Sequence, residues 1–124
     1  MVTWTSDELD RIGPADELDL ASLRHDGSRR DAVTMWVVRV GDELYVRSVK
    51  GSDGPWYRGT RSRGEGHVRA GGVERDVAFG AAGEDVADRI DAAYRAKYGG
   101  YPASVLGSVL TPRARAATIR LVPR

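Results

Sequence analysis

The stretch VTMWVVRV-GDE-LYVRSV, from Val33 to Val49, decides the fold. Two runs rich in β-branched and aromatic residues flank Gly-Asp-Glu, a pattern that predicts a β-hairpin. Its register stays open, because a three-residue loop pairs Val40 with Leu44 whereas a two-residue loop places Trp36 beside Arg47. One residue of slip exchanges the two faces of a strand, so the loop length decides which side chains share a face.

A second hairpin follows further along the chain. Residues 67–70 and 73–79 surround Gly71-Gly72, a strong signal for a two-residue turn. This turn pairs Arg69 with Glu74 and His67 with Asp76. Residues 50–66, between the hairpins, are glycine-rich and basic, and we expect a long loop there, which is usually functional or mobile.

Helices are predicted near both ends of the chain. Thr5-Ser-Asp-Glu8 fits a capping box and predicts a helix from Ser6 to about Ile12. Residues 84–98 have helical spacing and end at Gly99-Gly100, and Pro102 opens another short helix. Alternating runs at 18–23 and 117–122 add two strands. The expected fold is α+β: a small split β-barrel or strongly curved antiparallel sheet of five to six strands with peripheral helices, as one domain over residues 1–124.

Composition excludes several classes of function. Nineteen Lys and Arg face eighteen Asp and Glu, too even a balance for a nucleic-acid-binding protein. There is no cysteine, which excludes disulfides and thiolate metal sites. No stretch approaches the roughly 20 apolar residues of a membrane span, so a cytoplasmic location is expected. Arginines outnumber acids between Arg58 and Arg75, which leaves a local anion site open.

A phosphate cradle is the first candidate site. Arg47, Ser48, Lys50 and the amides around Gly51 combine cations, a hydroxyl and backbone donors, which phosphate groups require. Arg58 adds a cation in the same predicted loop. The alternative is a solvated loop whose cations pair with nearby acidic side chains.

Aromatic residues form the second candidate. Trp36, Tyr45, Trp56 and Tyr57 lie within 22 positions of one another, and such rings either stack on a flat ligand or fill a small barrel. The helix over residues 84–98 carries three candidate side chains at helical spacing, Tyr94, Lys97 and Tyr98. Together they either offer a hydroxyl, a cation and an aromatic ring to a pocket or cover the barrel.

Proton transfer is the third candidate chemistry. The predicted register places His67 opposite Asp76, and a carboxylate beside an imidazole suits a general base. The alternative is an exposed cross-strand ion pair. His67 and Asp76, together with the hydroxyl groups of Tyr45 and Tyr57, make up the candidate catalytic set. Two histidines without spaced carboxylate partners predict no metal site.

The sequence resembles a family of small bacterial proteins known only as a domain of unknown function. Four segments covering most of the chain carry the likeness: Trp4–Leu9, Trp36–Ser48, Trp56–Arg58 and Ile90–Tyr98. The plan is also similar to flavin- and deazaflavin-binding split β-barrels, in which a hairpin leads to a Gly-rich loop and a Pro-Trp-Tyr-like segment, here Ser48–Tyr57. This resemblance implies FMN or a deazaflavin as the cofactor.

Three functions remain open. The first is a flavin- or deazaflavin-dependent oxidoreductase, and the second is a cofactor-independent acid–base enzyme, a dehydratase or cyclase acting on a bulky natural product. The third is a non-catalytic ligand-binding module. All three bind a small molecule and involve neither nucleic acid nor membrane. A homodimer is expected, because pairing of subunits covers exposed sheet edges.

Overall fold

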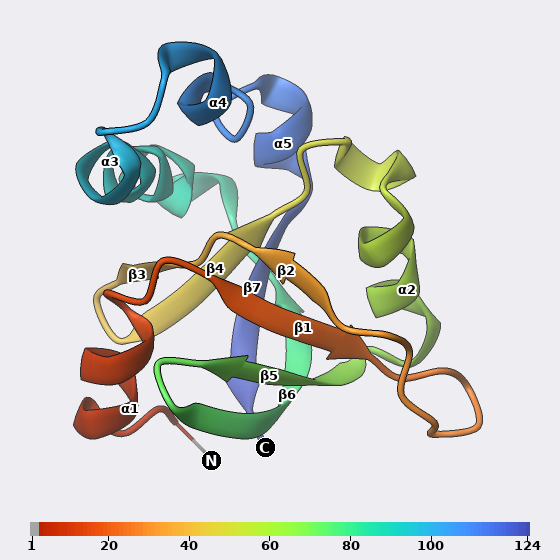
Figure 1. The fold of residues 1–124 in the computed structure, drawn as a ribbon. Helices are drawn as coiled ribbons and strands as arrows, with labels where there is room; N and C mark the ends of the chain where they lie inside the picture. The colour runs from red at the N-terminus through yellow and green to blue at the C-terminus, as the bar shows by residue number, and fades with distance from the viewer. Residues whose placement is uncertain (1–2) are drawn as a thin grey trace.

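The computed structural model describes residues 3–124 and consists of one curled antiparallel sheet with helices around it (Figure 1). The strand order is β2-β1-β5-β6-β7-β4-β3. The strands are β1 (Leu18–Ser22), β2 (Val33–Met35), β3 (Val38–Val40), β4 (Glu43–Arg47), β5 (Glu65–Ala70), β6 (Val73–Ala81) and β7 (Thr118–Pro123). The two edge strands, β2 and β3, follow each other in the chain with only Trp36 and Val37 between them. The sheet is therefore a half-barrel whose two edges are joined by the chain itself.

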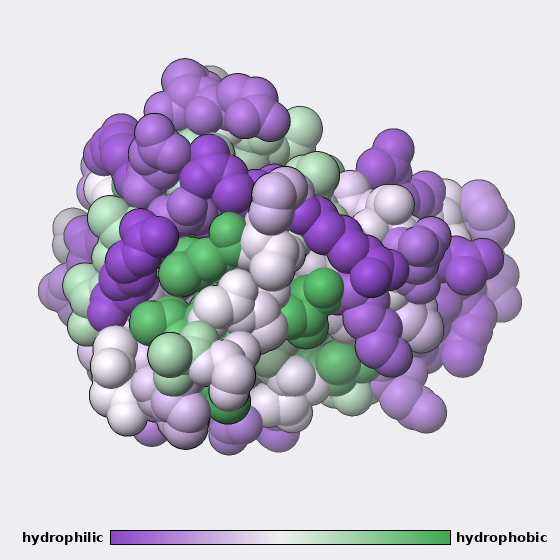
Figure 2. Space-filling model, turned by 90° about the horizontal axis from the view of Figure 1, so that it is seen from above, coloured by the Kyte–Doolittle hydropathy of each residue, from purple (hydrophilic) through white to green (hydrophobic). Residues whose placement is uncertain are grey.

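The helices cover the ends and one side of this sheet (Figure 1). They are α1 (Ser6–Ile12), η1 (Gly51–Asp53), α2 (Pro55–Arg63), η2 (Glu84–Val86), α3 (Ala87–Tyr98), α4 (Ala103–Gly107) and α5 (Pro112–Ala116). Figure 2 looks onto the side that carries α3, α4 and α5; apolar side chains gather near its middle, whereas the side towards α2 is mostly hydrophilic. Among residues 3–124, no helix has the length and apolar character of a membrane span.

Both hairpins form, and the structure settles the open register. Val40 pairs with Glu43 and Val38 with Tyr45, so the first hairpin has the two-residue loop. The second hairpin has its predicted register, with His67 opposite Asp76. The capping box is also confirmed, because the Glu8 amide donates to Thr5 Oγ1 and the Thr5 amide donates to Glu8 Oε1.

Two predictions were wrong. The sheet has seven strands rather than five to six, because the run over residues 33–40 divides into β2, which pairs with β1, and β3, which pairs with β4. Residues 50–66 are not a loop but contain η1 and the nine-residue helix α2. Pro55 stands at the first helical position, where no amide donor is needed, and Gly64 ends the helix at φ 74°.

Buried apolar side chains form two clusters. The larger fills the inside of the sheet with residues from α1 and all strands except β2 and β3, such as Ile12, Leu20 and Leu121. The smaller lies beneath α3 and contains Val38, Tyr45, Ile90, Tyr94, Tyr98 and Val109. Because α3 rests on β3 through this second cluster, it fixes the edge of the sheet that follows Trp36.

Candidate functional site

Arg47, predicted to bind phosphate, is buried beneath α3. Its guanidinium donates to Asp91 Oδ1 at 2.5 Å, to the carbonyls of Val109 and Ala87, and to Thr118 Oγ1. Its side chain is 0% exposed. Arg47 therefore holds α3 and the segment before α5 against β4 and β7, and it does not face a ligand.

The rest of the predicted phosphate cradle does not assemble around one point. Ser48 is buried and donates its hydroxyl to the Gly51 carbonyl at 2.8 Å. Gly51, at φ 65°, is covered by Arg113, whose Cγ would lie 2.4 Å from an added Cβ. Of the four residues, only Lys50 is exposed. The arrangement stabilises the turn after β4.

Aromatic residues meet at the seam between β2 and β3. The Trp36 ring stacks on Tyr98 with centroids 4.0 Å apart and planes 7° apart. The Tyr98 hydroxyl donates to the Asp16 carbonyl and accepts from the Val37 amide. Burial raises the pKa of Tyr98 to about 12. The helix face over residues 94–98 thus packs on the seam, in line with the covering role that the sequence left open.

The two remaining tyrosines of the predicted set differ in setting. Tyr45 is buried beneath α3, and burial raises the pKa of its hydroxyl. Tyr57 on α2 accepts a hydrogen bond from Arg61 Nη1 at 3.2 Å and borders a hollow of about 380 Å³ together with Phe79 and Thr118. Trp56, its neighbour, packs partly buried against the larger core cluster. Tyr57 therefore borders a concave space.

His67 lies on β5 between two carboxylates. Its Nδ1 is 3.0 Å from Asp76 Oδ1, and its Nε2 is 3.1 Å from Glu74 Oε1. The hydrogen bond with His67 lowers the pKa of Asp76. The sequence predicted the first partner and missed the second. Because both ring nitrogens have a carboxylate partner, the imidazole is oriented on the sheet surface.

Arg30, which the sequence analysis did not single out, occupies the groove between α2 and the loop after β1. It donates to the Leu23 carbonyl at 2.9 Å, to the Gly59 carbonyl at 3.4 Å and to Ser62 Oγ at 3.1 Å. An added Cβ on Gly59 would lie 2.8 Å from Ser22 Oγ and in ordinary contact, 3.4 Å, with Arg30 Cδ, so the glycine permits the close approach of α2 to β1 beside Arg30. Glycine within a basic helical stretch was the signal that could have identified the groove.

The charge of Arg30 has no ion-pair partner within the part of the chain that the structure describes. A hollow of about 430 Å³ opens beside it, lined by Arg30, Pro55, Arg58, Gly59 and Ser62. Arg58 is exposed and likewise makes no ion pair with residues 3–124. Arg30 also lines a second hollow of about 430 Å³, which extends to Arg29 and His67 and is bordered as well by Asp19, Asp31 and Glu74. Arg30 thus borders two concave spaces as a cation that neutral oxygens hold in place and that pairs with no carboxylate among residues 3–124.

Searches for similar structures find the same fold in proteins of low sequence identity. A conserved hypothetical protein from Mycobacterium tuberculosis is 15% identical, with 100% of this chain and 82% of that chain covered and a TM-score of 0.65. An FAD-binding protein from Mesorhizobium loti is 15% identical over 99% and 92% of the two chains, with a TM-score of 0.59. An F420 reductase is 17% identical over 99% and 94%, with a TM-score of 0.56.

These identities show a shared fold, that of flavin- and F420-binding split barrels, and not a shared activity. A search of curated proteins finds no match. A family model matches residues 8–121, nearly the whole chain, and its description is "uncharacterized protein conserved in bacteria". The chain therefore belongs to the bacterial family DUF2255.

Proposed function

We propose that this protein binds a phosphate-bearing flavin or deazaflavin in the groove between α2 and the loop after β1. The observation that carries the proposal is the guanidinium of Arg30, which neutral oxygens hold in place while no carboxylate of the described residues lies within ion-pair distance. The fold supports a ligand of this class, because similar structures include an FAD-binding protein and an F420 reductase.

The groove suits a phosphate for electrostatic reasons. Arginine presents a planar set of donors that matches phosphate oxygens, and pairs of this kind are about twice as strong as neutral hydrogen bonds. Arg30 is already oriented by its three acceptors, so little side-chain entropy is lost when an anion binds. Arg58, which lines the same hollow, supplies a second cation.

The volume of the groove also suits a cofactor. Each of the two hollows beside Arg30 measures about 430 Å³, within the range of small-molecule sites. With phosphate at Arg30 and Arg58, the rest of the ligand extends along the hollow that reaches His67. A bound flavin or deazaflavin supplies hydride transfer, so the proposed activity is that of an oxidoreductase.

The acid–base alternative has less support from the geometry. Tyr45, one of its candidate residues, is buried beneath α3. His67 has carboxylates at both ring nitrogens, so neither nitrogen is left to take a substrate proton directly. No second function is proposed.

The test is a titration of the purified protein with FMN, F420 and riboflavin, in which the fluorescence of the added compound measures binding. Arg58→Ala should weaken FMN or F420 binding about tenfold, because one exposed charge-assisted contact is lost. Riboflavin, which has no phosphate, should bind more weakly and respond little to the substitution. Inorganic phosphate should compete with FMN or F420 and not with riboflavin.

The matched control is Arg95→Ala, which removes an exposed arginine from α3 on another face of the protein. Its affinity for FMN and F420 should equal that of the wild type. Two results would contradict the proposal: neither phosphate-bearing cofactor binds the folded wild type, or Arg58→Ala and Arg95→Ala bind with the same affinity.

A further inference from the structure

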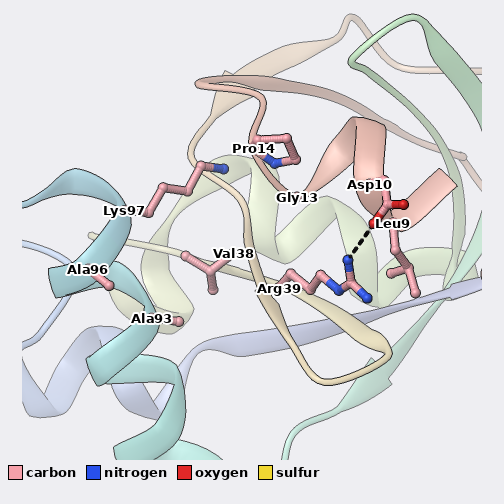
Figure 3. A pocket seen from close by; sticks show the side chains of 9 residues that line it. All are labelled: Leu9, Asp10, Gly13, Pro14, Val38, Arg39, Ala93, Ala96 and Lys97. Atoms are coloured by element: carbon pink, nitrogen blue, oxygen red, sulfur yellow. Dashed lines mark hydrogen bonds and ion pairs between the residues drawn. The ribbon is translucent and has the colours of Figure 1, made fainter. Parts of the chain in front are cut away.

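A separate hollow, of about 530 Å³ and away from Arg30, lies between α1, β3 and α3, on the other side of the sheet from α2 (Figures 1 and 3). Its walls are mostly apolar and include Leu9, Pro14, Val38, Ala93 and Ala96. Figure 3 shows Lys97 reaching towards Pro14 at one end and Arg39 beside Asp10 at the other. The hollow thus has an apolar middle and a cation at each end.

The two cations differ in how they are neutralised. Arg39 Nη1 is 3.1 Å from Asp10 Oδ1, and Arg39 Nε donates to the Gly41 carbonyl at 2.8 Å. Asp42 lies 3.9 Å from the same guanidinium. Lys97, by contrast, has no carboxylate oxygen within 4.0 Å among residues 3–124. The charge at the Lys97 end of the hollow is therefore the uncompensated one.

The ammonium group of Lys97 has donors to spare. It donates one hydrogen bond, of 2.6 Å, to the Val37 carbonyl, and it lies 5.0 Å from the centroid of the Tyr98 ring. An ammonium group carries three N–H donors, so two have no acceptor among the described residues. Burial lowers the pKa of Lys97 to about 8, and the more distant Asp16 carboxylate opposes this only in part.

A half-buried cation with unused donors gains most from an anion that brings its own acceptors. A carboxylate presents two oxygens and one charge, which matches one free ammonium group. A phosphate needs more donors than this end of the hollow provides, because Arg39 is held by Asp10 and Gly41. The apolar walls favour a ligand whose remaining atoms are hydrocarbon.

We propose that this hollow is a second binding site, for a small carboxylate with an apolar body. The carboxylate group lies on Lys97, and the hydrocarbon part lies against Val38, Ala93 and Ala96. The site is independent of the proposed cofactor groove, since the two hollows have no lining residue in common. A ligand here bridges α3, β3 and α1.

The experiment is an NMR titration of ¹⁵N-labelled protein with benzoate, and with benzamide as the neutral match. Benzoate should shift the amides of residues 38–39 and 93–97, whereas benzamide at the same concentration should shift them at least tenfold less. Inorganic phosphate should leave them unchanged. The same titration with phenylacetate and hexanoate extends the test to other apolar carboxylates.

Two variants separate charge from shape. Lys97→Met removes the ammonium group while keeping a long apolar side chain, and it should weaken benzoate binding at least tenfold. Ala96→Phe fills the hollow from α3 and should weaken benzoate binding while Lys97 stays in place. Arg95→Met, on the exposed side of the same helix, is the matched control and should bind benzoate like the wild type.

Benzoate affinity should also fall about tenfold between pH 7 and pH 9, because the protonated fraction of Lys97 falls by that factor around a pKa of about 8. The other charged groups facing Lys97 are Asp10 and Arg39 across the hollow and Asp16 behind it. Equal shifts with benzoate and benzamide, binding retained in Lys97→Met, or no shift with any of the three carboxylates would overturn the proposal. FMN and F420 binding should be unchanged in Lys97→Met, so the two proposals fail separately.

Discussion

Replacing Asp91 with asparagine is expected to destabilise the protein by about 3–5 kcal/mol, the usual cost of leaving one partner of a buried ion pair without its counter-charge. The Arg47 side chain is 0% exposed and that of Asp91 is 8% exposed. Asparagine preserves the shape but leaves one acceptor oxygen where Asp91 offers two, to Arg47 and to Arg115, so the negative charge and one of these hydrogen bonds are lost. The Arg47 guanidinium would remain beneath α3 with only neutral oxygens around it.

Urea denaturation followed by tryptophan fluorescence measures this effect. With a slope of about 2 kcal/mol per molar urea, the expected loss moves the midpoint down by about 2 M. That is a large share of the roughly 5–15 kcal/mol by which folded domains are stable. The emission of Trp36, which stacks on the last turn of α3, reports directly on the region that Arg47 holds.

Asp88→Asn is the matched control on the same helix. Asp88 and Asp91 both contact Arg115, but only Asp91 contacts Arg47, and the Asp88 side chain is 92% exposed. Exposed ion pairs contribute little, so Asp88→Asn should leave the midpoint almost unchanged. Equal midpoint shifts for the two variants would refute the assignment of the stabilisation to the buried pair.

A double variant keeps the test valid if Asp91→Asn does not fold. Arg47→Leu with Asp91→Leu removes both charges together and leaves no buried ion. Because apolar replacement of a buried pair is often neutral or stabilising, this variant should fold and exceed Asp91→Asn in stability. A double variant less stable than the single one would show that the hydrogen bonds of Arg47 to Val109, Ala87 and Thr118 matter more than its charge.

Four other substitutions give separate checks. In urea unfolding, Gly72→Ala should lower the free energy of unfolding by about 1 kcal/mol, because alanine is strained at φ 81°. Gly71→Ala should lower it by at least about 1 kcal/mol more, since the added Cβ would lie 2.1 Å from the Arg11 carbonyl oxygen. Lys97→Met should be more stable than the wild type below pH 8, because folding wild-type Lys97 there favours loss of a proton that the unfolded chain holds. This penalty shrinks between pH 8 and 10.5, as the lysine of the unfolded chain also loses its proton. Thermal unfolding should therefore show the advantage of the variant decreasing over that pH range. Tyr94→Phe should leave the free energy of unfolding unchanged or raise it by up to about 1 kcal/mol, since the buried hydroxyl has no hydrogen-bond partner among residues 3–124. A loss of more than about 1 kcal/mol would contradict this.

Local signals in the sequence predicted the local structure. The Gly71-Gly72 turn fixed a register in which His67 meets Asp76, because two glycines at positive φ admit one hairpin geometry. The Thr5–Glu8 capping box gave the start of α1 for the same reason: its partners are three residues apart. The α2 helix was missed although Pro55 and Gly64 mark its ends, because its basic interior, with Gly59 in the middle, lacks apolar periodicity.

Long-range pairing could not be derived in this way. Nothing in the run Val33–Val40 marks the division at Trp36, since all its residues suit a strand. The division arises because the first part of the run pairs with β1 and the second part pairs with β4, at opposite edges of the sheet. Arg47 similarly meets Asp91 across 44 positions, so its burial depends on the packing of α3. Arg30 and Gly59 are 29 positions apart, and their contact depends on a helix that the sequence analysis expected to be a loop.

The Trp36–Val37 connection has a consequence for how this architecture varies. Because the two margins of the sheet are consecutive pieces of one strand-like run, the two residues between them limit how far apart the margins can lie. Inserting a residue at this point would let the margins move apart, and the filled interior would then have to repack or admit water. A change of spacer length therefore acts on the packing inside the sheet, while the ladders elsewhere can keep their register.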